Sequence, residues 1–110
     1  SDAANLFQDE LEHLFMESSL PFAKIMAEGK RYQQASKLMC DALRYNTTND
    51  AVVRLLYQIC LAQDSLGQAS QVLKQYREAL SKENFNEQEI QEALQDFPKD
   101  KPVQGWLVDG

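Results

Sequence analysis

Residues that carry enzyme chemistry are scarce in this chain. Its 110 residues include one histidine, two cysteines and four glycines. His13 falls on the polar side of an amphipathic segment, where a solvated side chain is expected. The cysteines are not spaced as a zinc or redox pair, and the glycines are too isolated to form a phosphate-binding loop. We therefore expect no catalytic site, no metal and no cofactor, and predict that the protein is not an enzyme.

Basic residues and long apolar runs are also in short supply. Eleven Lys and Arg residues stand against 17 Asp and Glu residues, which gives a net charge of −6 and an isoelectric point near 4.7. Such a chain repels a phosphate backbone. No stretch reaches the roughly 18 apolar residues of a membrane span, and the first residues do not resemble a signal peptide. We expect a soluble cytoplasmic protein that binds neither nucleic acid nor membrane by itself.

What the chain does contain is a repeat. The tripeptide Gln34-Ala35-Ser36 returns as Gln68-Ala69-Ser70, at an offset of 34 residues. This offset is the period of a two-helix repeat. Apolar positions match at the same offset in the pairs Phe22 and Leu56, Ile25 and Ile59, Met26 and Cys60, Tyr32 and Leu66, Leu38 and Val72, and Met39 and Leu73. A shared tripeptide inside a matched apolar pattern indicates a stack of helical hairpins.

Apolar spacings of three and four residues predict an all-α fold, a stack of antiparallel hairpins with five to six helices. The expected helices are Leu6–Phe15, Leu20–Glu28, Tyr32–Tyr45, Ala51–Gln63, Gly67–Lys82 and Glu87–Asp96. We assign 1–97 to one helical domain and 98–110 to a C-terminal tail that caps it or links it onward. The chain begins at Ser1 without methionine, so we expect it to be a segment of a longer protein.

Local signals set the expected helix ends. Ser18 and Ser19 before Pro21 predict a helix start, because proline is tolerated in a first turn. The polar run 46–50 offers N-caps for the next helix, and Asn86 with Glu89 reads as a capping box. In the tail, Trp106 is expected to cover the open end of the stack or, alternatively, to touch a neighbouring domain.

Small and aromatic residues mark the expected packing points. Ala35, Ala42 and Ala69 fall where paired helices approach most closely, because helices 8–10 Å apart leave no room for a large side chain. Tyr32 and Leu66 are the matching positions that we expect to pack between repeats. Tyr76 replaces Ala42 in the second repeat, which predicts a different neighbour there. Both cysteines, Cys40 and Cys60, lie on apolar faces and are expected to be buried.

The segment Ala27-Glu28-Gly29-Lys30-Arg31-Tyr32-Gln33-Gln34-Ala35, with Ala42, Leu43 and Leu55-Leu56 after it, resembles the tetratricopeptide repeat. It departs from that pattern at Thr47, where a proline is usual, and lacks the early tryptophan. The order of features from Leu11 to Leu94 is similar to the bacterial transcriptional activator domain, a helical module that follows a winged-helix DNA-binding domain. This resemblance implies a tetratricopeptide-like domain whose DNA-binding half lies outside the chain.

Two functions follow as hypotheses. The first is a regulatory module of a bacterial transcriptional regulator, which acts by contacts with a protein partner or with itself, including a possible homodimer. The second is a stand-alone tetratricopeptide adaptor or chaperone that holds a peptide in a concave groove. Matching repeat positions place that groove at Leu20, Lys24, Ala27, Arg54, Gln58 and Leu61. Lys24, Arg54 and Gln58 are its polar candidates, although Lys24 and Arg54 are also typical of solvated surface charge.

Overall fold

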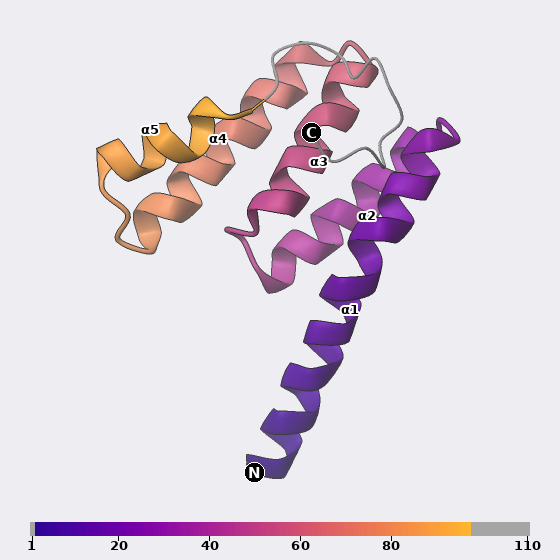
Figure 1. The fold of residues 1–110 in the computed structure, drawn as a ribbon, viewed down its shortest axis with the longest axis vertical. Helices are drawn as coiled ribbons and strands as arrows, with labels where there is room; N and C mark the ends of the chain where they lie inside the picture. The colour runs from indigo at the N-terminus through magenta and orange to yellow at the C-terminus, as the bar shows by residue number, and fades with distance from the viewer. Residues whose placement is uncertain (1, 98–110) are drawn as a thin grey trace.

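The computed structural model of the chain describes residues 2–97, and this part consists of helices joined by short turns (Figure 1). The helices are α1 (Asp2–Glu28), α2 (Tyr32–Tyr45), α3 (Asp50–Ala62), α4 (Leu66–Lys82) and α5 (Glu87–Gln95). Each helix packs on the next one, and α1 also contacts α3. The expected all-α stack is confirmed, and α2 has the predicted bounds.

Helix α3 is the centre of the stack, because it supplies side chains to two apolar clusters. One cluster joins α1, α2 and α3 around the fully buried Met39 and Ile59. The other joins α3, α4 and α5 around Tyr57, Tyr76 and Phe97. The three close-approach alanines, Ala35, Ala42 and Ala69, are buried as predicted.

The 34-residue offset reappears in the backbone of the turns. Lys30 and Asp64 both adopt a left-handed conformation, with φ values of 61° and 58°. In the first turn, the Arg31 N–H donates to the Met26 carbonyl at 2.8 Å, and in the second the Ser65 N–H donates to the Cys60 carbonyl at 2.9 Å. These bonds close the helix ends in the manner of a Schellman motif. The same closure recurs at Asn84, whose φ is 70°, and there the Phe85 N–H donates to the Leu80 carbonyl at 3.1 Å. It is therefore a shared way of ending these helices, and the 34-residue offset holds for the first two turns.

The expected break before Pro21 is wrong, since α1 runs through it without interruption. The Ser18 hydroxyl donates to the Leu14 carbonyl at 2.9 Å, and the Ser19 hydroxyl donates to the Met16 carbonyl at 3.3 Å. Both serines thus bond backward within the helix and do not cap a new one. Pro21 lies on the exposed side, where water can satisfy the carbonyl that its missing N–H leaves free.

Two capping predictions are confirmed. The Val52 N–H donates to the Asn49 side chain at 3.1 Å, which fixes the start of α3. At the start of α5, Asn86 and Glu89 form the predicted capping box, with bonds of 2.8 and 3.0 Å.

Two packing predictions are wrong. Leu66 is 66% exposed, because it opens the first turn of α4 and no described residue covers that turn. Cys40 is exposed while Cys60 is buried, since Cys40 lies on the outer side of α2. The predicted roles of Trp106 and of the tail lie outside the described residues.

Candidate functional site

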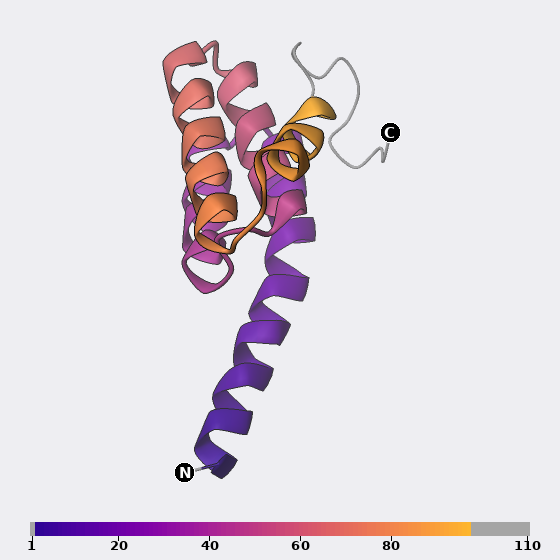
Figure 2. The same ribbon diagram turned by 90° about the vertical axis from the view of Figure 1, so that its left-hand side faces the viewer.

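The N-terminal half of α1 stands apart from the rest of the molecule. Residues 3–14, here called the stem, extend away from the stack in two perpendicular views (Figures 1 and 2). Phe15 packs on the stack, and its ring lies 5.2 Å from the ring of Tyr45 at the end of α2. Ser19 is the first buried residue of α1. All residues of the stem except Glu12 are exposed.

Large apolar side chains follow one line along the exposed side of α1. They are Phe7, Leu11, Leu14, Phe22 and Ile25, and each is between 46% and 67% exposed. At 3.6 residues per turn these positions fall within an arc of roughly 80°. We call these five residues the apolar stripe. It extends beyond the stem to the end of α1, on a different side of the helix from the buried Ala23 and Ala27.

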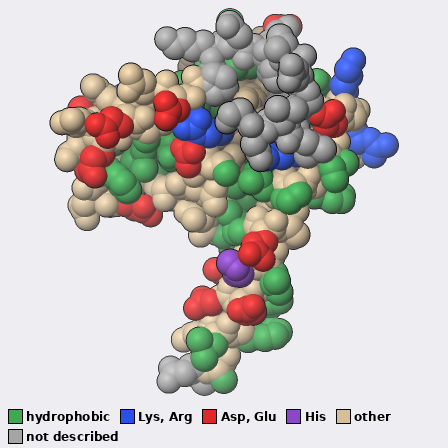
Figure 3. Space-filling model, in the orientation of Figure 1, with side chains coloured by type: hydrophobic (Ala, Val, Ile, Leu, Met, Phe, Trp, Pro, Cys, Tyr) green, Lys and Arg blue, Asp and Glu red, His purple; other side chains and the backbone are tan. Residues whose placement is uncertain are grey.

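Acidic residues occupy another side of the same stem. Asp9, Glu10, Glu12 and Glu17 are the charged residues of 3–23 apart from His13, and His13 Nε2 lies 3.2 Å from Glu17 Oε1. The space-filling view shows apolar side chains along one edge of the stem, with acidic side chains and the histidine on the other (Figure 3). The stem is therefore amphipathic although no described residue covers its apolar side.

The six predicted groove residues lie on two neighbouring helices. Leu20, Lys24 and Ala27 are on α1, and Arg54, Gln58 and Leu61 are on α3, with which α1 is in contact. Leu20 and Ala27 belong to the first apolar cluster and Leu61 to the second. Lys24, Arg54 and Gln58 are half-buried. Three of the six thus serve packing, and the polar three stay candidates for a partner.

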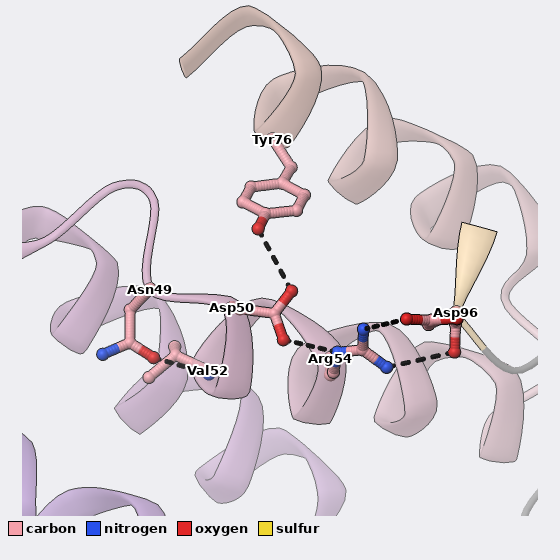
Figure 4. A network of polar contacts seen from close by, with 6 residues as sticks. All are labelled: Asn49, Asp50, Val52, Arg54, Tyr76 and Asp96. Atoms are coloured by element: carbon pink, nitrogen blue, oxygen red, sulfur yellow. Dashed lines mark hydrogen bonds and ion pairs between the residues drawn. The ribbon is translucent and has the colours of Figure 1, made fainter. Parts of the chain in front are cut away.

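Arg54 is engaged within the chain (Figure 4). Its Nε donates to Asp50 Oδ2 at 2.5 Å, and its Nη1 donates to the Asp96 carbonyl at 3.0 Å. Its guanidinium also lies over the Phe97 ring, 4.9 Å from the centroid. Because Asp96 is the C-cap of α5, Arg54 ties the last helix to α3. A peptide carboxylate would have to compete with these contacts.

Tyr76 completes this network from α4. Its hydroxyl donates to Asp50 Oδ1 at 3.1 Å, and its ring lies 5.8 Å from that of Phe97. Burial, together with the charge of Asp50, raises the pKa of Tyr76 to about 12. The different neighbour predicted for this position is thus the end of the last helix.

A hollow of about 450 Å³ opens between α3 and α4 near the end of α2. Its apolar floor includes Val53, Leu56 and Val72, and its rim carries Glu78 and Lys82. Within residues 3–97, every buried polar side-chain atom has a hydrogen-bond partner. The hollow therefore has an apolar floor, but no described buried polar group in it lacks a hydrogen-bond partner and could select one ligand.

Two other kinds of site, a metal centre and a membrane span, are not found among the described residues. The described residues contain no group of three or more metal-ligating side chains, and none of the described helices is long and apolar enough to cross a bilayer. The apolar stripe, which no described residue covers, is exposed apolar surface of the kind that is typical of interaction sites.

Sequence reasoning recognised the amphipathic stem but missed the continuation of its apolar line. The signal was the seven-residue spacing of Phe7 and Leu14 and the fourteen-residue spacing of Leu11 and Ile25. The expected break at Pro21 divided this pattern between two helices and hid it. Comparisons with known protein families, with curated proteins and with solved structures find no match for this chain.

Proposed function

We propose that this chain is a non-catalytic protein–protein interaction module and that the apolar stripe of α1 is its binding surface. We further propose that it is the regulatory part of a cytoplasmic bacterial transcriptional regulator, in which a separate domain outside this chain contacts DNA. The first proposal depends on the geometry of α1. The second depends on the resemblance of residues 11–94 to the bacterial transcriptional activator domain.

The main support for the interaction proposal is that α1 exposes large apolar side chains and buries small ones. Phe7 is 67% exposed, whereas Ala23 and Ala27 are 0% and 1% exposed. Contiguous exposed apolar surface with a polar border is typical of protein interaction sites. The acidic side of the stem supplies that border and keeps the free surface soluble.

The peptide-adaptor function is the second candidate. It is favoured by the half-buried Lys24 and Gln58 on two helices in contact. The intramolecular contacts of Arg54 count against it. Titration of acidic C-terminal peptides would separate the two functions. Saturable binding that Lys24→Ala weakens supports the adaptor, whereas no binding together with clear self-association supports the regulatory module.

Site-specific photocrosslinking in the native cell tests the interaction proposal. Benzoylphenylalanine replaces Leu11 in the stripe or Leu66 on α4, which is the matched exposed control. We expect protein adducts from the Leu11 position and few from the Leu66 position. Equal yields, or no adduct from the stripe, would contradict the proposal.

The transcriptional part of the proposal has its own test. The intact mass of the native protein should exceed 12.6 kDa by at least the mass of roughly 100 residues, which is enough for a DNA-binding domain. A native product of about the mass of this chain would contradict that part and leave the interaction module standing.

A further inference from the structure

Charge is divided unevenly along the first third of the chain. Residues 3–23 carry four carboxylates and no Lys or Arg, whereas residues 24–31 carry three bases, Lys24, Lys30 and Arg31, and one acid, Glu28. Lys30 and Arg31 are exposed in the turn that follows α1. An acidic stem and a basic far end thus belong to one helix and the turn at its end. The two parts are complementary to each other in a second copy of the chain.

The apolar stripe has the spacing of a helix-pairing seam. Phe7 and Leu14 are seven residues apart, and Leu11 and Ile25 are fourteen apart, with Ser18 midway. Seven-residue repeats of apolar positions place one face of a helix against another helix. From Phe7 to Ile25 the seam is about 27 Å long, at 1.5 Å per residue.

From these observations, and resting on the interaction function proposed above, we propose that the apolar stripe binds a second copy of this chain. The two α1 helices lie antiparallel about a two-fold axis near residue 16. Phe7 of one copy then meets Ile25 of the second copy, and Leu14 meets Ser18. Each stem covers the exposed C-terminal half of the other α1 helix, so the whole stripe is buried in one isologous interface.

The antiparallel direction follows from the charges. It brings Glu10 of one copy beside Lys24 of the second. A parallel pair would set two stems with three carboxylates each, Asp9, Glu10 and Glu12, side by side. Glu17 lies near the axis in the antiparallel pair, where His13 of its own helix is 3.2 Å away and offers it a partner.

The size of the stripe suits a reversible dimer. Five large side chains that each bury roughly 100 Å² give roughly 500 Å² per copy, or about 1,000 Å² in the pair. That area is at the lower end for specific protein interfaces. We therefore expect a dissociation constant in the micromolar range. A membrane surface is a poorer occupant, since helices that lie on bilayers carry Lys and Arg on the polar side, and this stem carries carboxylates.

Sedimentation equilibrium of the 110-residue chain tests the proposal. We expect a monomer–dimer equilibrium in which Leu11→Gln and Phe22→Gln each raise the dissociation constant roughly 100-fold, because each apolar contact occurs twice in the dimer. Leu66→Gln replaces a still more exposed leucine on α4 and should leave it unchanged. Circular dichroism confirms that each variant is folded. A wild-type chain that stays monomeric at about 1 mM would overturn the proposal, as would an equal effect of Leu66→Gln.

A charge swap tests the orientation. Glu10→Lys alone and Lys24→Glu alone should each weaken the dimer several-fold, and the double variant should recover the wild-type affinity. A double variant weaker than either single one would overturn the antiparallel arrangement.

The failure of this proposal is distinguishable from failure of the interaction function. A monomeric chain whose Leu11 position crosslinks to a different protein in cells would overturn the homodimer and leave the interaction module intact. A monomer that binds phosphatidylcholine vesicles through Leu11 would overturn the homodimer in favour of a membrane surface. A monomer with neither property would overturn both proposals.

Discussion

The two halves of α1 differ in burial, because the C-terminal half has one side packed on the stack and one side exposed, whereas the stem is exposed nearly all round. In the C-terminal half, Ala23 and Ala27 are almost fully buried against α2 and α3. In the stem, the larger Phe7 and Leu14 are more than half exposed. Burial in this helix therefore depends on which neighbours are present rather than on how apolar each side chain is.

This contrast gives the two halves different tasks. Small side chains allow the backbones of packed helices to approach closely, which stabilises the stack. Large side chains on a projecting helix add nothing to the stack and offer area to a partner. Substitutions in the stack should therefore change the free energy of unfolding, and substitutions in the stem should change association.

The largest effect is expected in the core. Ile59→Ala removes a fully buried side chain of α3 and should lower the free energy of unfolding by about 2–5 kcal/mol. Phe7→Ala in the stem should lower it by less than about 0.5 kcal/mol when the chain is dilute and monomeric. Urea denaturation followed by circular dichroism measures both. Similar losses of unfolding free energy for the two variants would contradict the contrast between the stack and the stem.

Overpacking of a close approach should have the next largest effect. Ala69→Leu places three extra carbons at a buried contact of α4 and should cost about 1–3 kcal/mol. Ala35→Leu tests the matching position of the first repeat in the same way. Ala51→Leu on the exposed side of α3 is the control and should be nearly neutral. Thermal melts that show no loss for Ala69→Leu would contradict the repeat register.

A smaller and pH-dependent effect is expected at Tyr76. Its folded-state pKa of about 12 lies above the ordinary value of 10.0, so the neutral phenol stabilises the fold fully below about pH 10. That contribution is lost as the pH rises toward 12. Tyr76→Phe should cost about 1 kcal/mol at neutral pH and should make the alkaline loss of stability shallower than in wild type. Parallel alkaline profiles for the two proteins would show that Tyr76 is not the responsible group.

The smallest effect is expected at the turn that sets α2 against the packed half of α1. Lys30 has a left-handed φ of 61°, which costs a non-glycine residue roughly 1 kcal/mol. Lys30→Gly should therefore raise the melting temperature slightly, with little change in stem helicity. A lower melting temperature would mean that the Lys30 side chain contributes more than its backbone strain costs.

Much of the stack could be predicted from sequence because its signals are local. The 3.6-residue period located α2, the polar run 46–50 located the start of α3, and Asn86 located the start of α5. The continuity of α1 could not be predicted, because Ser18 and Ser19 suit a helix start as well as they suit backward bonds within a helix. The packing of the α1 residues around these serines on α2 and α3 decides between a helix start and a continuous helix.

The candidate site was only half predictable for a related reason. A line of apolar residues such as Leu11, Leu14 and Phe22 gives the same sequence pattern whether it packs against its own chain or against another chain. Arg54 shows the converse case, since its spacing matched a groove position while the fold brought it against Asp96, 42 residues away. Sequence spacing identifies faces, and the arrangement of the helices assigns their neighbours.

Hydrogen–deuterium exchange at several protein concentrations tests the central claim most directly. If the stem is the association surface, amides of residues 4–14 should exchange more slowly as concentration rises, while amides of α3 keep their rates. Leu11→Gln should abolish the concentration dependence. Stem exchange rates that do not change with concentration, in a wild-type chain shown to be folded, would contradict the assignment of this surface to self-association.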